Sequence, residues 1–211
     1  QNVLLEYKKK LEIDEKHVIL HLGFISRYKG IDYAIKAMKI VSEIYPNTLL
    51  IIAGDYFNPL DKYNPRKHRY LPYLKQLTKD LGLESNVMFI TRHLSEEDMH
   101  ALLELADVVV LPYVTNNISA SGILSKAMAC GKPVIVTDCG WFYGYVYHEI
   151  NGLIVPQRNV EALAQAILEI LDSPKKAEIL KRNMLRIRKR FQWDEVAKLW
   201  LKVLTDVEEV R

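Results

Sequence analysis

The chain has 211 residues, of which 49% are hydrophobic and 26% charged, and 29 Lys+Arg against 26 Asp+Glu give a formal charge of +3. These values are typical of a globular chain and exclude wholesale disorder, and the small basic excess argues against nucleic acid as a partner. No apolar run reaches the ~18 residues that span a bilayer, and residues 1–6 lack the features of a signal peptide. We therefore expect one domain over residues 1–211, located in the cytoplasm.

The two cysteines, Cys130 and Cys139, form no CxxC pair and have no histidine nearby at the sequence spacing of metal ligands. This pattern disfavours a disulfide framework or a zinc site. It predicts two small buried or half-buried side chains in a reducing compartment. We therefore expect no zinc site at these two residues.

Short apolar segments alternate with segments of helical periodicity along most of the chain. Strands are predicted at residues 18–23, 48–53, 87–90, 108–111, 133–136 and 153–155. Helices are predicted at residues 31–45, 70–81 and 123–128, and after a capping box that begins at Ser95. Residues 58–69 lack periodicity and are expected to form a surface loop.

Three more helices are predicted near the C-terminus, with Asn159, Ser173 and Asp194 at their starts. The second of them should turn its apolar residues inward; these are Leu180, Met184, Ile187 and Phe191. A series of apolar strands separated by helices indicates a parallel sheet covered on both faces. The predicted fold class is therefore α/β, a doubly wound, Rossmann-like sheet that ends in several helices.

In such a sheet, ligands bind beyond the carboxyl ends of the strands, at the topological switch point. The first strand is followed by residues 23–30, where Arg27 and Lys29 accompany a glycine that permits close approach. A diphosphate would suit this arrangement of cations. Two exposed cations in a solvated turn are the alternative interpretation.

A second candidate segment, residues 117–123, precedes the helix predicted after the fourth strand. The first N–H groups of a helix attract phosphate, and Ser119 and Ser121 could add hydroxyl donors. The alternative is that one of these serines only caps the helix.

Five segments in chain order match one family pattern. They are Gly23-x5-Lys29-Gly30-Ile31-Asp32, LIIAGD at residues 50–55, ADVVVLPY at 106–113, SGILSKAMACGKPVI at 121–135 and NGLIVP at 151–156, with RFQW trailing at 190–193. On these segments, which cover nearly the whole chain, the sequence resembles the C-terminal domain of the retaining group 1 (family 4) glycosyltransferases. This resemblance implies one half of the two-domain GT-B fold.

The resemblance also implies a function. The domain would bind a nucleoside diphosphate sugar as a substrate and serve a hexosyltransferase that acts with retention, without a metal and without a cofactor. Lys29 would bind phosphate, Arg27 would replace a family arginine absent at Phe24, and Arg92-His93 would lie near the base. The candidate substrate-binding residues are Gly23, Arg27, Lys29, Arg92, Ser119, Ser121, Gly122, Ile123 and Lys126.

The sequence departs from the family at three glutamate positions, which fall at Ile118, Lys126 and Gly144. Neither isoleucine nor lysine can accept hydrogen bonds from a ribose or a sugar. The aromatic run at residues 141–147 could stack on a base or sugar, or pack against a neighbouring domain. These departures leave two alternatives open, a degenerate binding module without activity and a sugar-nucleotide epimerase, and no catalytic residue is assigned.

GT-B enzymes work in a cleft between two domains, so the resemblance implies that the N-terminal acceptor domain is missing from this chain. Basic residues recur between 175 and 190 on a predicted amphipathic helix. They would form a solvated outer face. Alternatively, they would contact anionic lipid near a membrane-associated glycolipid or polysaccharide acceptor.

Overall fold

The computed structural model describes residues 7–9, 11, 13, 17–55, 69–116 and 120–209. Ile118, the candidate Ser119 and all but the last residue of the loop predicted at 58–69 lie outside the described residues.

The described residues form a six-stranded parallel sheet in the order β3-β2-β1-β4-β5-β6. The strands are β1 (His17–Leu22), β2 (Thr48–Ala53), β3 (Val87–Ile90), β4 (Val108–Leu111), β5 (Val134–Thr137) and β6 (Gly152–Val155). All six predicted strands are confirmed, and so is the doubly wound Rossmann-like class. The order reverses between β1 and β4, which pair through Leu20 and Val109, so the switch point lies there.

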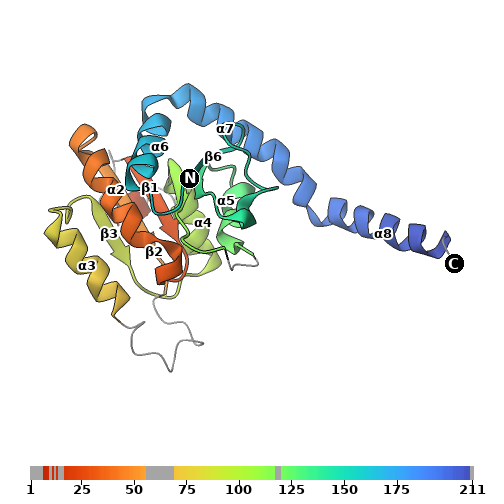
Figure 1. Cartoon of the computed structure of the whole chain (residues 1–211), viewed down its shortest axis with the longest axis horizontal. Helices are drawn as coiled ribbons and strands as arrows, with labels where there is room; N and C mark the ends of the chain where they lie inside the picture. Colours follow the sequence, from red (N-terminus) through yellow and green to blue (C-terminus); the bar gives the residue numbers. More distant parts are fainter. Residues whose placement is uncertain are drawn as a thin grey trace.

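Helices cover both faces of this sheet (Figure 1). They are α2 (Ile31–Ile44), α3 (Tyr70–Asp80), α4 (Glu96–Leu105), α5 (Gly122–Ala129), α6 (Val160–Asp172), α7 (Pro174–Ile187) and α8 (Trp193–Glu209). Residues of α2, α3 and α6 share one core cluster with Ile19 and Val108 of the sheet. Residues of α4 and α5 share the other with Leu20 and Val109, because successive strand residues point to opposite faces.

Most of the predicted helix starts are confirmed. Ser95 and Asp98 form the capping box of α4, Asn159 accepts a hydrogen bond from the Ala162 N–H, and Ser173 accepts one from the Lys176 N–H. The prediction for Asp194 is wrong, because this residue lies inside the first turn of α8.

The prediction that Phe191 faces the core is also wrong, since its side chain is 39% exposed. Phe191 lies in the short 3-10 helix η4 (Arg188–Phe191), and its ring stacks on Tyr145 at 4.8 Å between centroids. Beyond it α8 projects away from the sheet (Figure 1), so no core is available at this end of the chain. Among the helices described, none combines the length and the apolar character needed to cross a membrane.

Candidate functional site

A cleft of about 350 Å³ opens where the carboxyl ends of β1 and β2 approach the start of α5. It is lined by Leu22, Gly23, Phe24, Lys29, Gly54, Asp55, His93, Leu94, Met99, Gly122, Ile123 and Lys126. The cleft lies beside the switch point, where the fold class predicts a ligand site. Its volume falls within the usual range of small-molecule sites.

The backbones of the loops after β1 and β4 are in close contact beside this cleft. Gly30 has φ 65°, and a Cβ built on it would lie 1.9 Å from the Pro112 carbonyl oxygen. The Val114 N–H donates a hydrogen bond of 2.9 Å to the Tyr28 carbonyl. Only glycine allows so close an approach of two backbones at a positive φ. The contact fixes the position of Lys29, the residue before Gly30.

Lys29 is 8% exposed, although its side chain ends in a charge. Its Nζ donates a hydrogen bond to the Tyr113 hydroxyl and lies 4.0 Å from the centre of the Tyr113 ring and 5.2 Å from that of Tyr28. Burial lowers the pKa of Lys29 to about 8. The site thus holds an ammonium group that water solvates poorly and that an anion would stabilise.

Tyr113 connects Lys29 to the start of α5. Its hydroxyl lies 3.1 Å from Ser121 Oγ, and Ser121 caps α5 by accepting a hydrogen bond of 3.3 Å from the Leu124 N–H. Burial raises the pKa of the Tyr113 phenol to about 12, so the hydroxyl stays neutral and keeps a proton to donate. Sequence reasoning missed Tyr113 as a site residue. The available signal was a tyrosine directly after a buried strand, since a buried tyrosine hydroxyl normally finds a partner.

The glycine-lined part of the cleft unites candidates from two distant segments. Gly23 has φ 116°, and a Cβ built on it would lie 3.3 Å from Cγ1 of Ile123. A Cβ on Gly122 would meet nothing within 4 Å, so the backbone at the start of α5 is open to a ligand. Gly23, Lys29, Gly122, Ile123 and Lys126 therefore share one cleft, whereas Ser121 does not line it and is connected to Lys29 through Tyr113.

Two other candidates lie elsewhere. The guanidinium carbon of Arg27 is 5.1 Å from the ring centre of Tyr70 and 5.9 Å from that of Tyr73, both on α3, and Arg27 does not line the cleft. The Arg92 guanidinium binds the Asp98 carboxylate through contacts of 2.6 and 3.0 Å. Arg92 therefore supports the start of α4, while its neighbour His93 lines the cleft.

Lys126 lines the cleft and pairs with Glu96 on α4. The cation thus stands where the family pattern has a glutamate, and its partner carboxylate comes from another helix. The two interpretations of the aromatic run at 141–147 both stay open, and no residue of this run lines the cleft. Phe142 is buried against Tyr113 at 5.2 Å between ring centres, whereas Tyr143 is 59% exposed.

The basic residues of α7 are partly neutralised by acidic neighbours. Lys176 pairs with Glu149 at 3.2 Å and also with Glu169, and Lys181 lies 3.9 Å from Glu178. These pairs fit a solvated outer face.

Residues 5–186 match the family model described as glycosyl transferases group 1. The chain belongs to this family. Among its relatives is an uncharacterized glycosyltransferase of Methanocaldococcus jannaschii, 29% identical over 186 residues, which are 88% of this chain and 44% of the relative. The chain thus spans less than half the length of this curated relative.

Solved structures of other proteins share the fold. Anabaena HepE in complex with UDP superposes with a TM-score of 0.84 and 22% identity, over 97% of this chain and 53% of that chain. Sucrose-phosphate synthase from Thermosynechococcus elongatus superposes with a TM-score of 0.78 and 26% identity, over 98% of this chain and 49% of that chain. The expected C-terminal half of a GT-B fold in a group 1 glycosyltransferase is therefore confirmed.

Proposed function

We propose that this chain is the donor-binding part of a hexosyltransferase that uses a nucleoside diphosphate sugar and retains the anomeric configuration. The observation that carries the proposal is the meeting of Lys29 with the start of α5 at one cleft. An ammonium group and the N–H groups of a helix start are both suited to bind a diphosphate. Retention and the hexosyl class rest on the family resemblance.

The chemical task of these groups follows from the reaction. When the bond between the anomeric carbon and the diphosphate oxygen breaks, the electron pair stays on the diphosphate, whose negative charge increases. The Lys29 ammonium and the dipoles at the start of α5 would stabilise that charge. We assign diphosphate binding to Lys29, Gly23, Gly122 and Ile123, with Ser121 in support.

Known complexes support a nucleotide donor. HepE has been crystallised with UDP and with UDP-glucose, and this chain shares its fold over 97% of its residues. We propose that the acceptor, a membrane-associated glycolipid or a polysaccharide, binds to a second domain, as the GT-B arrangement implies. We further propose a cytoplasmic location, a reaction that needs no resident cofactor, and one domain over residues 1–211.

Lys126 favours a second candidate function, a degenerate module that binds nucleotides weakly or not at all. A lysine cannot accept hydrogen bonds from ribose hydroxyls, and here it faces the cleft paired with Glu96. A sugar-nucleotide epimerase would share the nucleotide cleft and complete its site with different residues.

Calorimetric titration of the purified protein with UDP, GDP and ADP tests the proposal. At least one nucleotide should bind with a dissociation constant of millimolar or lower. Lys29→Ala should weaken that binding by about 1–3 kcal/mol, the scale of a hydrogen bond to a charged group. Lys39→Ala removes an exposed lysine of α2 that pairs with Glu43 instead, and should bind as the parent does.

Each contrary outcome has a distinct meaning. If a folded sample binds none of the three nucleotides, the chain is the degenerate module. If Lys29→Ala binds as tightly as the parent, the phosphates lie elsewhere and the assignment of the cleft is wrong.

A further inference from the structure

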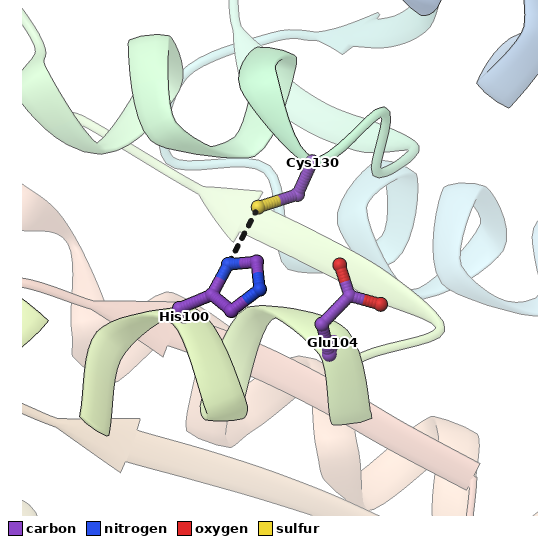
Figure 2. A group of neighbouring side chains, drawn as sticks. All are labelled: His100, Glu104 and Cys130. Carbon is purple, nitrogen blue, oxygen red and sulfur yellow. Dashed lines mark hydrogen bonds between the residues drawn. The ribbon is translucent and has the colours of Figure 1, made fainter. Parts of the chain in front are cut away.

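Three metal-binding side chains meet on the surface between α4 and α5, outside the cleft (Figure 2). They are His100, Glu104 and Cys130, and their donor atoms all lie within 4.8 Å of one another. Cys130 Sγ lies 3.6 Å from His100 Nδ1. The sequence gives Cys130 no histidine at ligand spacing, so tertiary structure alone creates this cluster.

The cluster lies on two helices, α4 and α5, whose inner faces are buried. His100 and Glu104 are four residues apart on α4, a spacing that brings side chains to the same face of a helix. Figure 2 shows both of them rising from α4 on the side of Cys130, which caps the C-terminal end of α5. The two helices bury Ala101, Leu102 and Leu103 of α4 and Ala127 and Met128 of α5. The donor atoms are therefore held by packed elements rather than by loops.

We propose that His100, Glu104 and Cys130 bind one zinc ion, with a fourth coordination position open to water. Zinc–sulfur and zinc–nitrogen bonds of about 2.3 and 2.0 Å at a tetrahedral angle place the two ligand atoms roughly 3.5 Å apart. In the structure, Cys130 Sγ and His100 Nδ1 lie 3.6 Å apart, which meets this requirement, and a rotation of the Glu104 side chain would bring its carboxylate, within 4.8 Å of both atoms, onto the ion.

The donor set selects the metal. Thiolate and imidazole ligands suit zinc, whereas magnesium and calcium require oxygen ligands. Three protein ligands and one open position are an established zinc arrangement. On binding, the Cys130 thiol loses its proton to solvent and the thiolate binds the ion, so the charge and atoms balance.

Lys132 is the charged neighbour that contacts a proposed ligand, Glu104, and zinc would displace it from that carboxylate. Lys132 donates a hydrogen bond of 2.9 Å to the backbone carbonyl of Glu104, while its Nζ lies 3.9 Å from the Glu104 carboxylate. Lys126 is paired with Glu96. Along α5, Cys130 lies eight residues from Gly122, a rise of about 12 Å. The ion would therefore clamp α4 to α5, and its binding is independent of the proposed transferase activity.

Metal titrations of the purified protein, reduced with a phosphine and stripped by a chelator, test this site. Cobalt should bind one to one with a thiolate-to-metal absorption band in the near ultraviolet, and zinc should displace it. Cys130→Ser should lose the band, and His100→Ala and Glu104→Gln should each weaken zinc binding at least tenfold. The matched controls Cys139→Ser and Glu97→Gln should stay within twofold of the parent.

A second measurement uses only the parent protein, in case a variant fails to fold. Zinc at micromolar concentration should protect Cys130 from alkylation, read by mass spectrometry of its peptide, whereas millimolar magnesium should not. The proposal is overturned if the parent shows no saturable binding of one metal ion. It is equally overturned if Cys130→Ser keeps the charge-transfer band, or if zinc leaves Cys130 fully open to alkylation.

Discussion

Folding makes the Lys29 ammonium group easier to deprotonate. Its pKa is about 8 in the folded chain against 10.5 for a free side chain, and burial is the cause. Between these two pH values the unfolded chain binds more protons than the folded one, so the free energy of unfolding rises with pH there. Below pH 8 the buried ammonium costs stability, and a bound anion would offset that cost.

The lowered pKa of Lys29 predicts that nucleotide binding depends on pH. If only the protonated Lys29 binds a diphosphate, the affinity for UDP should fall roughly tenfold between pH 7 and pH 9. At pH 8 binding should take up protons, visible as a calorimetric enthalpy that changes with the buffer. Arginine stays charged over this range, so Lys29→Arg should lose most of the slope. An equal slope in that variant would assign the titration to another group.

Gly30 permits a second prediction at the residue scale. Gly30→Ala should lower the free energy of unfolding by about 2 kcal/mol or more, because the new Cβ collides with the Pro112 carbonyl. Gly82→Ala is the matched control. Gly82 has nearly the same φ, 66° against 65°, but nothing lies within 4 Å of a Cβ there, so only strain of about 1 kcal/mol is expected. Denaturant unfolding compares the stability of the two variants. Equal losses of stability would show that the close contact between Gly30 and the Pro112 carbonyl is not required.

At the scale of elements, two serines cap helices in the same way but in different places. Ser121 caps α5 and is hydrogen-bonded to Tyr113, whereas Ser173 caps α7. Replacing either by alanine should cost about 0.5–2 kcal/mol of stability. Only Ser121→Ala should also weaken UDP binding, roughly threefold to tenfold, since it breaks the connection from Lys29 to α5. Calorimetry on both variants checks this, and equal losses of affinity would show that Ser121 acts only as a cap.

Local chemistry settles most element boundaries but not all. The alternation of apolar strands and capped helices predicts every strand of the sheet, because each element needs only its own periodicity and caps. The same reasoning fails at the C-terminal end, where Phe191 and Trp200 follow a helical pattern but are 39% and 64% exposed. A periodic apolar face indicates that a helix could pack against another element. It does not show that such an element is in place.

At the scale of the whole molecule, α8 stands apart from the sheet (Figure 1). Its large apolar side chains are mostly exposed, among them Trp193 at 86% and Leu201 at 64%. Removal of residues 193–211 should therefore change the free energy of unfolding by less than about 1 kcal/mol, because little apolar area of the body would be uncovered. Denaturant unfolding of the shortened chain tests this, and a lost or broadened transition would show that α8 supports the core.

The amino-acid sequence by itself determined the α/β class, the six strands of the sheet, and Lys29 and Ser121 as candidates, because these follow from local periodicity and short motifs. Only the tertiary structure decided that Arg27 lies over Tyr70, and that Tyr113 stands between Lys29 and Ser121. Only it placed Cys130 beside His100, 30 positions away in the chain. Such contacts join side chains from different elements, and their partners depend on how the helices pack on the sheet, which no local pattern encodes.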